Sequence, residues 1–164
     1  MSQRLLVADS GPLIALARLG LLALPQQLFA EVLVTATVWR EVTGAPARSE
    51  HADLHTAQQQ GWLKVVDDPV TIPAIFASPL LDDGERTALA LSLAENCDVL
   101  IDERRGRLAA EAAGLNVVGT LGLLVRARQL SLIGPVRPLA ELLLSSGYHL
   151  ARSLVDMTLA ALGE

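Results

Sequence analysis

Short apolar runs alternate along the chain with longer stretches in which apolar residues recur at helical spacing. The short runs have the length and the bounding turns of buried strands, and they lie at Leu5–Ala8, Val32–Thr35, Leu63–Val66, Val99–Ile101 and, more weakly, Asn116–Val118. The helical stretches lie at Pro12–Leu19, Leu24–Phe29, Ala36–Val42, Ser49–Gln60, Glu85–Glu95, Leu108–Ala113, Leu121–Gln129, Pro138–Ser145 and Leu150–Leu162. Strands that alternate with helices predict right-handed crossovers. We therefore expect an α/β fold with a central, mostly parallel sheet that helices cover on both faces.

The length and the composition fit one domain that spans residues 1–164. Of the 164 residues, 51% are apolar but only 3% are aromatic, so leucine, alanine and valine must fill the core. Residues 67–84 contain three prolines and a DDG turn and are predicted to form the longest loop. The segment GAPARSEHAD at residues 44–53 is predicted to be a second loop, and neither loop has the character of a domain linker.

Acidic residues stand where predicted strands end or where the following helices begin. Asp9 closes the run LLVAD and Asp102 closes VLID, while Glu41 follows the second strand in VWREV and Glu85 follows the DDG turn. Ligand sites in open parallel sheets lie at the carboxyl ends of the strands, so these side chains are expected to share one cleft. Four carboxylates in one cleft repel one another, and their pKa values rise unless a cation neutralises them. Oxygen ligands without His or Cys suit Mg²⁺ or Mn²⁺, and the sequence therefore predicts a site for such an ion.

Each of these acids also has a structural interpretation when it is considered alone. Asp9 or Ser10 can cap the helix that follows the first strand, and Asp102 can cap the helix that follows the fourth. Glu85 in a first helical turn interacts favourably with the helix dipole, and Glu41 can face solvent on an amphipathic helix. The hypothesis of a metal site therefore depends on the four acids as a set.

The charge balance does not by itself indicate a nucleic-acid-binding protein, because 18 acidic residues against 13 basic ones give a formal net charge of −5. The densest basic group, Arg104, Arg105 and Arg107, lies just after Asp102 and can contact phosphates beside the predicted site. The alternative is a solvated helix start whose arginines pair with nearby acids. A single cysteine, Cys97, excludes an internal disulfide framework and fits a reducing compartment. With no signal peptide and no apolar stretch of membrane-spanning length, a cytoplasmic protein is predicted.

Four segments of the chain carry a family resemblance. VADSGPLIAL, VTATVWREV, DDGERTALALSLA and VLIDERRGRLAAEAAGLNVVGTLGLL follow one another in this order and together resemble the PIN-domain family. In particular they resemble its compact branch of predicted nucleic-acid-binding proteins, which often occur as toxins beside small antitoxins. The resemblance covers roughly residues 4–148, and its last segment is the most specific. It implies a PIN-like α/β/α sandwich, ribonuclease activity that depends on Mg²⁺ or Mn²⁺, and a tendency to form dimers.

The resemblance assigns roles to the acidic residues and their neighbours. The acidic residues of the family carry over to Asp9, Glu41, Glu85 and Asp102, although the wider family more often has aspartate at the position of Glu85. We expect Asp9 and Asp102 to bind the ion directly, and Glu41 and Glu85 to complete its shell or to orient the attacking water. Ser10 is a further candidate, for a metal-bound water or for the nucleic acid.

The C-terminal helical stretch carries an apolar stripe of Leu150, Leu154, Leu159 and Leu162, which can pack on the domain itself or on a second subunit. We therefore expect a homodimer that binds RNA and has no membrane association. The toxin resemblance implies in addition a small partner protein that holds the enzyme inactive. The alternative function is a PIN-like module that binds nucleic acid or protein without cleaving anything.

Overall fold

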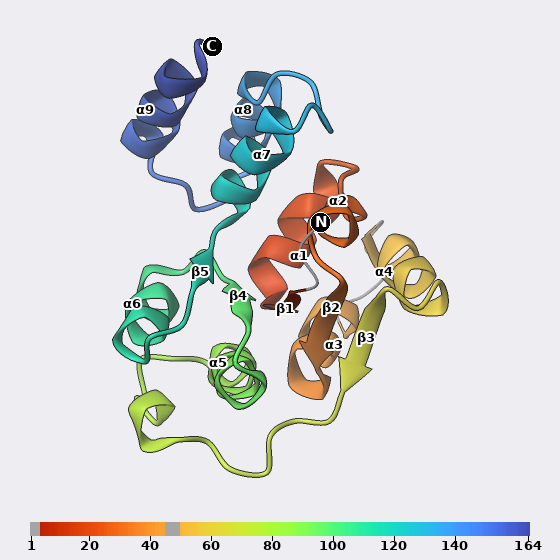
Figure 1. The fold of residues 1–164 in the computed structure, drawn as a ribbon, viewed down its shortest axis with the longest axis vertical. Helices are drawn as coiled ribbons and strands as arrows, with labels where there is room; N and C mark the ends of the chain where they lie inside the picture. The colour runs from red at the N-terminus through yellow and green to blue at the C-terminus, as the bar shows by residue number, and fades with distance from the viewer. Residues whose placement is uncertain (1–3, 45–49) are drawn as a thin grey trace.

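The computed structural model describes residues 4–44 and 50–164, and a five-stranded parallel sheet forms their centre (Figure 1). The strand order is β3-β2-β1-β4-β5. The strands are β1 (Leu5–Ala8), β2 (Glu31–Thr35), β3 (Leu63–Val66), β4 (Asp98–Leu100) and β5 (Val117–Val118). Val7 in the central strand pairs with Leu33 on one side and with Val99 on the other, and every pairing in the described residues is parallel. The α/β fold and the positions of all five strands are thus as the apolar runs predict.

Helices connect the strands and cover both faces of the sheet. They are α1 (Ser10–Arg18), α2 (Leu24–Leu28), α3 (Ala36–Thr43), α4 (Glu50–Gln59), α5 (Asp83–Glu95), α6 (Arg104–Ala112), α7 (Thr120–Gln129), α8 (Arg137–Ser145) and α9 (Arg152–Leu162). The predicted long loop at 67–84 contains one short 3-10 helix, Ala74–Phe76, and its last two residues already belong to α5. Residues 45–49 of the second predicted loop lie outside the described residues, and its remainder from Glu50 is helical.

The position of helix α5 explains why its sequence is apolar on most of its surface. It packs against β1, β2 and β4 of the sheet and also against α3 and α6. Ala88 and Leu91 belong to the larger core cluster around β1 and β2, whereas Leu89 and Ala90 belong to a second cluster with Phe76. A helix that contributes to two cores has little surface left for polar side chains.

The parallel topology brings the carboxyl ends of β1 and β4 side by side. The backbone N–H of Asp9 donates to the carbonyl oxygen of Leu100 at 3.0 Å, which continues the ladder one residue beyond β1. Asp102 follows β4 by two residues. The two aspartates that close predicted strands therefore lie at one edge of the sheet, on neighbouring strands.

Helices α7, α8 and α9 lie together at one end of the molecule, where the chain also ends (Figure 1). Val155 and Leu159 of α9 are buried, and α9 contacts α7 and α8. The predicted stripe is divided as a result, because Leu159 packs inside this end of the molecule while Leu154 is 47% exposed. No helix in the described part of the chain is long and apolar enough to span a membrane.

Candidate active site

Asp9 is a buried carboxylate that lacks a hydrogen-bond partner at one oxygen. It stands at the N-cap position of α1, but its side chain makes no capping hydrogen bond, so the capping interpretation is wrong for this residue. The side chain is buried, and Oδ1 meets no donor among the described residues. A buried acceptor without a partner is unfavourable, and the site therefore calls for a proton or a cation at this oxygen.

The electrostatic surroundings of Asp9 also favour a proton or a cation at its carboxylate. Burial, together with the charges of Asp82, Glu85 and Glu41, raises the pKa of Asp9 to about 8, against the lowering effect of the hydrogen bond from the Ser10 backbone N–H. A carboxyl group with this pKa carries a proton for much of the time at neutral pH. A bound divalent cation would reverse this balance and stabilise the charged form.

Asp102 differs from Asp9 because donors surround it. Oδ1 accepts a hydrogen bond from the backbone N–H of Thr120 at 2.8 Å, and Oδ2 accepts from the Thr120 hydroxyl at 2.6 Å and from the hydroxyl of Tyr148. Thr120 is the first residue of α7, whose own N-cap residue, Gly119, has no side chain to offer. Asp102 thus caps α7, a helix further along the chain than the one for which the sequence suggested it.

The backbone at Gly119 lies close to the Asp102 carboxylate and to the Arg107 side chain. A Cβ added at Gly119 would lie 3.2 Å from Asp102 Oδ1 and 2.5 Å from Nη1 of Arg107, so only glycine fits without displacement of a neighbour. Burial, together with the charge and hydrogen bond of Asp102, raises the pKa of Tyr148 far above its usual value. Tyr148 is therefore a permanent hydrogen-bond donor at this site.

Glu85 has both of the roles that the sequence suggested as alternatives. It forms a capping box at the start of α5, in which its backbone N–H donates to Asp82 Oδ1 at 2.7 Å and its Oε2 accepts from the Asp82 N–H at 2.9 Å. It is also buried, and burial together with the charges of Asp82, Glu103 and Glu41 raises its pKa, while the bond from the Asp82 N–H lowers it. The cap therefore fixes an acid inside the acidic cluster.

Glu41 reaches the same cluster from α3. It is solvent-accessible, as its amphipathic helix predicts, but its carboxylate lies against the start of α5, where a Cβ added at Gly84 would be 2.5 Å from Oε2. Partial burial and the charge of Asp82 raise the pKa of Glu41, whereas hydrogen bonds from the Ser10 hydroxyl and the Gly84 backbone lower it. Ser10 thus interacts with an acid of the site.

Two residues of the site were missed by sequence reasoning. Asp82 is the N-cap residue of α5, and its charge also acts on Asp9, Glu41 and Glu85. The doubled aspartate before Gly84 was a usable signal for it. Tyr148 is 46 residues from Asp102 in the chain, and no local pattern points to it.

The donor set fits a hard divalent cation held partly by water. A cavity of about 50 Å³ is lined by residues from the ends of β1 and β4 and from the segment before α9: Asp9, Gly11, Pro12, Asp102, Glu103, Tyr148 and His149. Within residues 4–44 and 50–164, no three His, Cys, Asp or Glu side chains are close enough to hold an ion jointly. Mg²⁺ commonly uses one or two carboxylates and keeps several waters, so Asp9 and Asp102 suffice as direct protein ligands.

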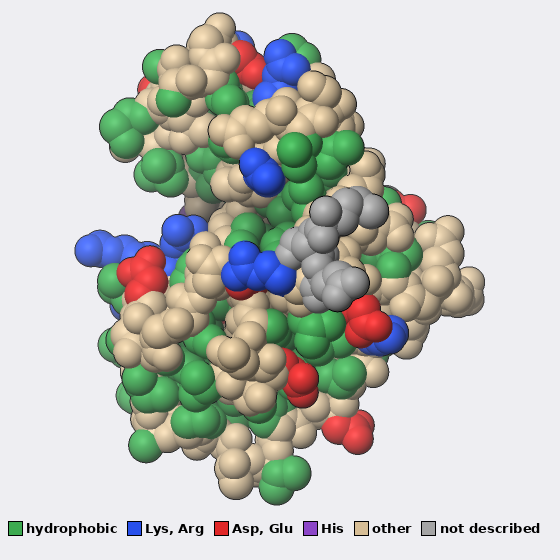
Figure 2. Space-filling view, in the orientation of Figure 1, with side chains coloured by type: hydrophobic (Ala, Val, Ile, Leu, Met, Phe, Trp, Pro, Cys, Tyr) green, Lys and Arg blue, Asp and Glu red, His purple; other side chains and the backbone are tan. Residues whose placement is uncertain are grey.

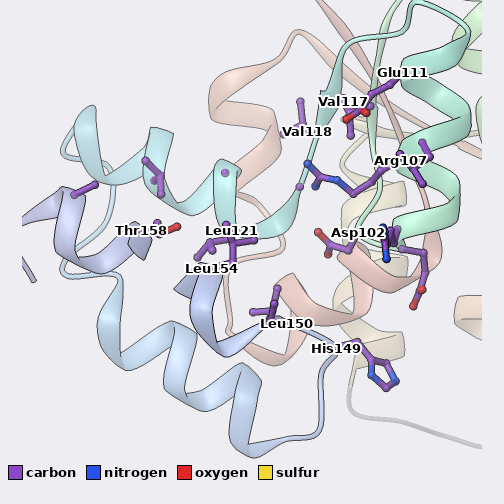
Figure 3. Close-up of a pocket in the computed structure, with 18 of the residues that line it drawn as sticks. Asp102, Arg107, Glu111, Val117, Val118, Leu121, His149, Leu150, Leu154 and Thr158 are labelled. Carbon is purple, nitrogen blue, oxygen red and sulfur yellow. The ribbon is translucent and has the colours of Figure 1, made fainter. Parts of the chain in front are cut away.

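The basic cluster of Arg104, Arg105 and Arg107 opens α6 and borders this site. None of the three forms an ion pair in the described part of the chain, so the local pairing that the alternative predicts is wrong, but Arg104 and Arg105 are exposed, as that alternative expects of a solvated helix start. Arg104 and Arg107 line a groove of about 1030 Å³ that runs from Asp102 along α7 and α9. Figure 3 shows Arg107 beside Asp102 at one end of this groove and Leu121 and Leu154 further along it. In the space-filling view, basic side chains border the indentation between α6 and the α7–α9 end of the molecule (Figure 2).

A parallel α/β domain with clustered carboxylates at the carboxyl edge of its sheet belongs to a class whose sites suit divalent cations. A family model described as a PIN domain matches residues 5–164, and the chain therefore belongs to the PIN-domain family. The fold is similar to that of a PilT N-terminus domain protein from the archaeon Sulfolobus solfataricus, with a TM-score of 0.57 and 15% sequence identity over 75% of this chain and 92% of that one. No curated protein matches the sequence.

The contrast between the two aspartates predicts opposite effects of the same substitution. Asp9→Asn removes a charge that is buried among other carboxylates, and should raise the free energy of unfolding of the metal-free protein by about 1 kcal/mol or more near pH 8. Asp102→Asn deprives three donors of their charged acceptor and should lower it by about 1–3 kcal/mol. Urea denaturation in EDTA measures both changes. Asp156→Asn, at an exposed carboxylate on α9, is the matched control, and equal signs for the two site variants would contradict the assignment.

The raised pKa of Asp9 also predicts how stability depends on pH. Because the folded protein binds this proton more tightly than the unfolded chain, stability must fall as pH rises from the unfolded value of 3.8 to the folded value of about 8. Glu41 and Glu85 shift in the same direction and add to the fall. We expect the Tm in EDTA to be ~5 °C or more lower near pH 9 than near pH 5, and Asp9→Asn to remove most of this difference. A difference that persists in full in Asp9→Asn would assign the effect to other groups.

Proposed function

We propose that the protein is an endoribonuclease that hydrolyses RNA phosphodiester bonds with the help of Mg²⁺ or Mn²⁺. The observation that carries the proposal is the buried, unpartnered Oδ1 of Asp9 within a cluster of carboxylates at the carboxyl edge of the sheet. Membership of the PIN-domain family, in which nucleases are common, supports it. The unpaired arginines beside the cavity supply the positive charge that an RNA substrate requires.

The residues divide the work according to their surroundings. Asp9 and Asp102 would hold the cation directly, and Glu41, Glu85 and Asp82 would hold its water shell. A bound Mg²⁺ or Mn²⁺ supplies an activated water and offsets the charge that develops on the phosphate. Glu41 is an accessible acid of the cluster and has a raised pKa, so its carboxylate is suited to take the proton of the attacking water.

The arginines of α6 would hold the substrate. Arg104 and Arg107 form no ion pair in the described residues and line the groove next to Asp102, so phosphate contacts there need no existing pair to break. Phosphate contacts of this kind fix the register of a strand and weaken as salt rises. Such contacts offset the repulsion that a cluster of acids exerts on RNA.

A second candidate is a PIN-like module that binds RNA without cleaving it. It is favoured by the absence, within the described residues, of three carboxylates close enough to share one ion. Cleavage assays separate the two functions. The endoribonuclease cleaves RNA when a divalent cation is present, whereas the binding module does not cleave RNA with or without a cation.

Cleavage of a mixed RNA pool should therefore require a divalent cation. We expect activity with Mn²⁺ or Mg²⁺, loss of activity in EDTA, and a fall of at least about a hundredfold in Asp9→Asn because the direct ligand is removed. Asp156→Asn should cleave at the wild-type rate, since its carboxylate lies on α9 and pairs with Arg152. RNA binding without cleavage under every condition would favour the module that only binds.

We also propose that the enzyme is a homodimer and the toxin of a toxin–antitoxin pair. Exposed apolar side chains on α9, Leu154 and Met157, support a surface that a second chain covers. Light scattering at micromolar concentration should give twice the mass of the chain, and a strictly monomeric mass would contradict the dimer.

Co-purification with a small protein encoded beside it tests the toxin role, and cleavage that such a protein does not inhibit would contradict that role.

A further inference from the structure

Tyr148, the only tyrosine in the sequence, is held in place by backbone contacts on both sides. It lies in the connection between α8 and α9, directly after the turn at Gly147. Its backbone N–H donates to the carbonyl oxygen of Leu143 at 3.1 Å, and its carbonyl oxygen accepts from Leu150 at 2.9 Å. These contacts fix the side chain over Asp102 from a part of the chain that carries none of the acids.

The hydrogen bond from Tyr148 uses the acceptor capacity that a cation would need. A carboxylate oxygen has two lone pairs. Oδ2 of Asp102 already accepts from the Thr120 hydroxyl, so the Tyr148 hydroxyl takes its second lone pair, and Oδ1 accepts from the Thr120 backbone. Oδ2 therefore has no free lone pair in this arrangement, whereas Oδ1, with one donor, keeps one.

Orientation of Asp102 does not depend on Tyr148. Thr120 alone donates to both carboxylate oxygens, at 2.8 and 2.6 Å, and this pair of bonds fixes the carboxylate plane. The bond from Tyr148 is a third one, made to an oxygen that is already oriented. A structural role in positioning Asp102 therefore does not explain it.

The Tyr148 hydroxyl also lies close to the segment that follows Asp9. A Cβ added at Gly11, two residues after Asp9, would be 3.5 Å from the phenol oxygen. Tyr148, Asp9 and Asp102 line the same cavity of about 50 Å³. Tyr148 thus contributes to the wall of the cavity that both aspartates line.

We propose that the hydrogen bond from Tyr148 to Asp102 Oδ2 is a latch on the cation site, which a divalent cation must open before Asp102 can ligate it through Oδ2. The inference rests on the metal site of the proposed function. Opening the latch removes a hydrogen bond between the edge of the sheet and the connection between α8 and α9, so cation binding through Oδ2 is coupled to the contacts of this connection. Tyr148 then sets the cation concentration at which the site fills.

Mn²⁺ titration by calorimetry tests the latch on the full-length protein. Tyr148→Phe keeps the ring and removes only the donor, so it should bind Mn²⁺ roughly tenfold or more tightly than wild type. Ser146→Ala is the matched control because it removes a hydroxyl two residues away that bonds to Leu143 O and not to Asp102. Its affinity should equal that of wild type.

A second measurement uses the wild-type protein and does not depend on a variant that folds. With ring-¹³C-labelled tyrosine, only Tyr148 gives signals, and these should shift on addition of Mg²⁺ with the same midpoint as cation binding. Equal or weaker Mn²⁺ affinity in Tyr148→Phe, or unchanged tyrosine signals at saturating Mg²⁺, would overturn the latch while leaving the metal site intact. Absence of cation binding in both proteins would overturn the latch and the proposed function together.

Discussion

The constraint on which the site depends is the burial of the Asp9 carboxylate at the end of the central strand. β1 lies between β2 and β4, so the residue that follows it is enclosed by chain on both sides. Burial there raises the pKa of Asp9, and Asp82, Glu85 and Glu41 add their repulsion to it. A domain without a use for this oxygen would gain stability from almost any neutral side chain at the same position. The acidic cluster therefore lowers the stability of the metal-free fold, as the cation site proposed above would require.

The aspartate that follows the neighbouring strand, β4, has the opposite surroundings. Asp102 lies at the same edge of the sheet, yet three donors satisfy its carboxylate. The two aspartates occupy similar positions in the topology, but Oδ1 of Asp9 lacks a partner among the described residues, whereas Oδ2 of Asp102 has no free lone pair. A cation that joined Asp9 to Oδ2 of Asp102 would have to displace a donor, so its binding there would be a competition as well as an attraction.

Sequence patterns predict the sheet and the positions of the main acids because both depend on local order along the chain. Apolar runs mark the strands, and the carboxyl ends of parallel strands necessarily meet at one edge. The surroundings of each acid could not be predicted in this way. The bond from Tyr148 to Asp102 spans 46 residues, and no local pattern shows that Arg104 and Arg107 form no ion pair within the described residues. Glu85 illustrates this limit of local patterns. Its capping box is a local pattern, yet it also places an acid in a site that distant segments form.

Asp102 also connects the edge of the sheet with the C-terminal helices. Its carboxylate follows β4, but its donors come from the first residue of α7 and from the connection between α8 and α9. Arg107 packs over Gly119 beside the same carboxylate, which adds α6 to the junction. A protein that covers the exposed face of α9 would act on helices that contact Asp102 through only one or two residues. The same carboxylate is thus suited to bind a cation and to transmit a change in the packing of the C-terminal helices to the site.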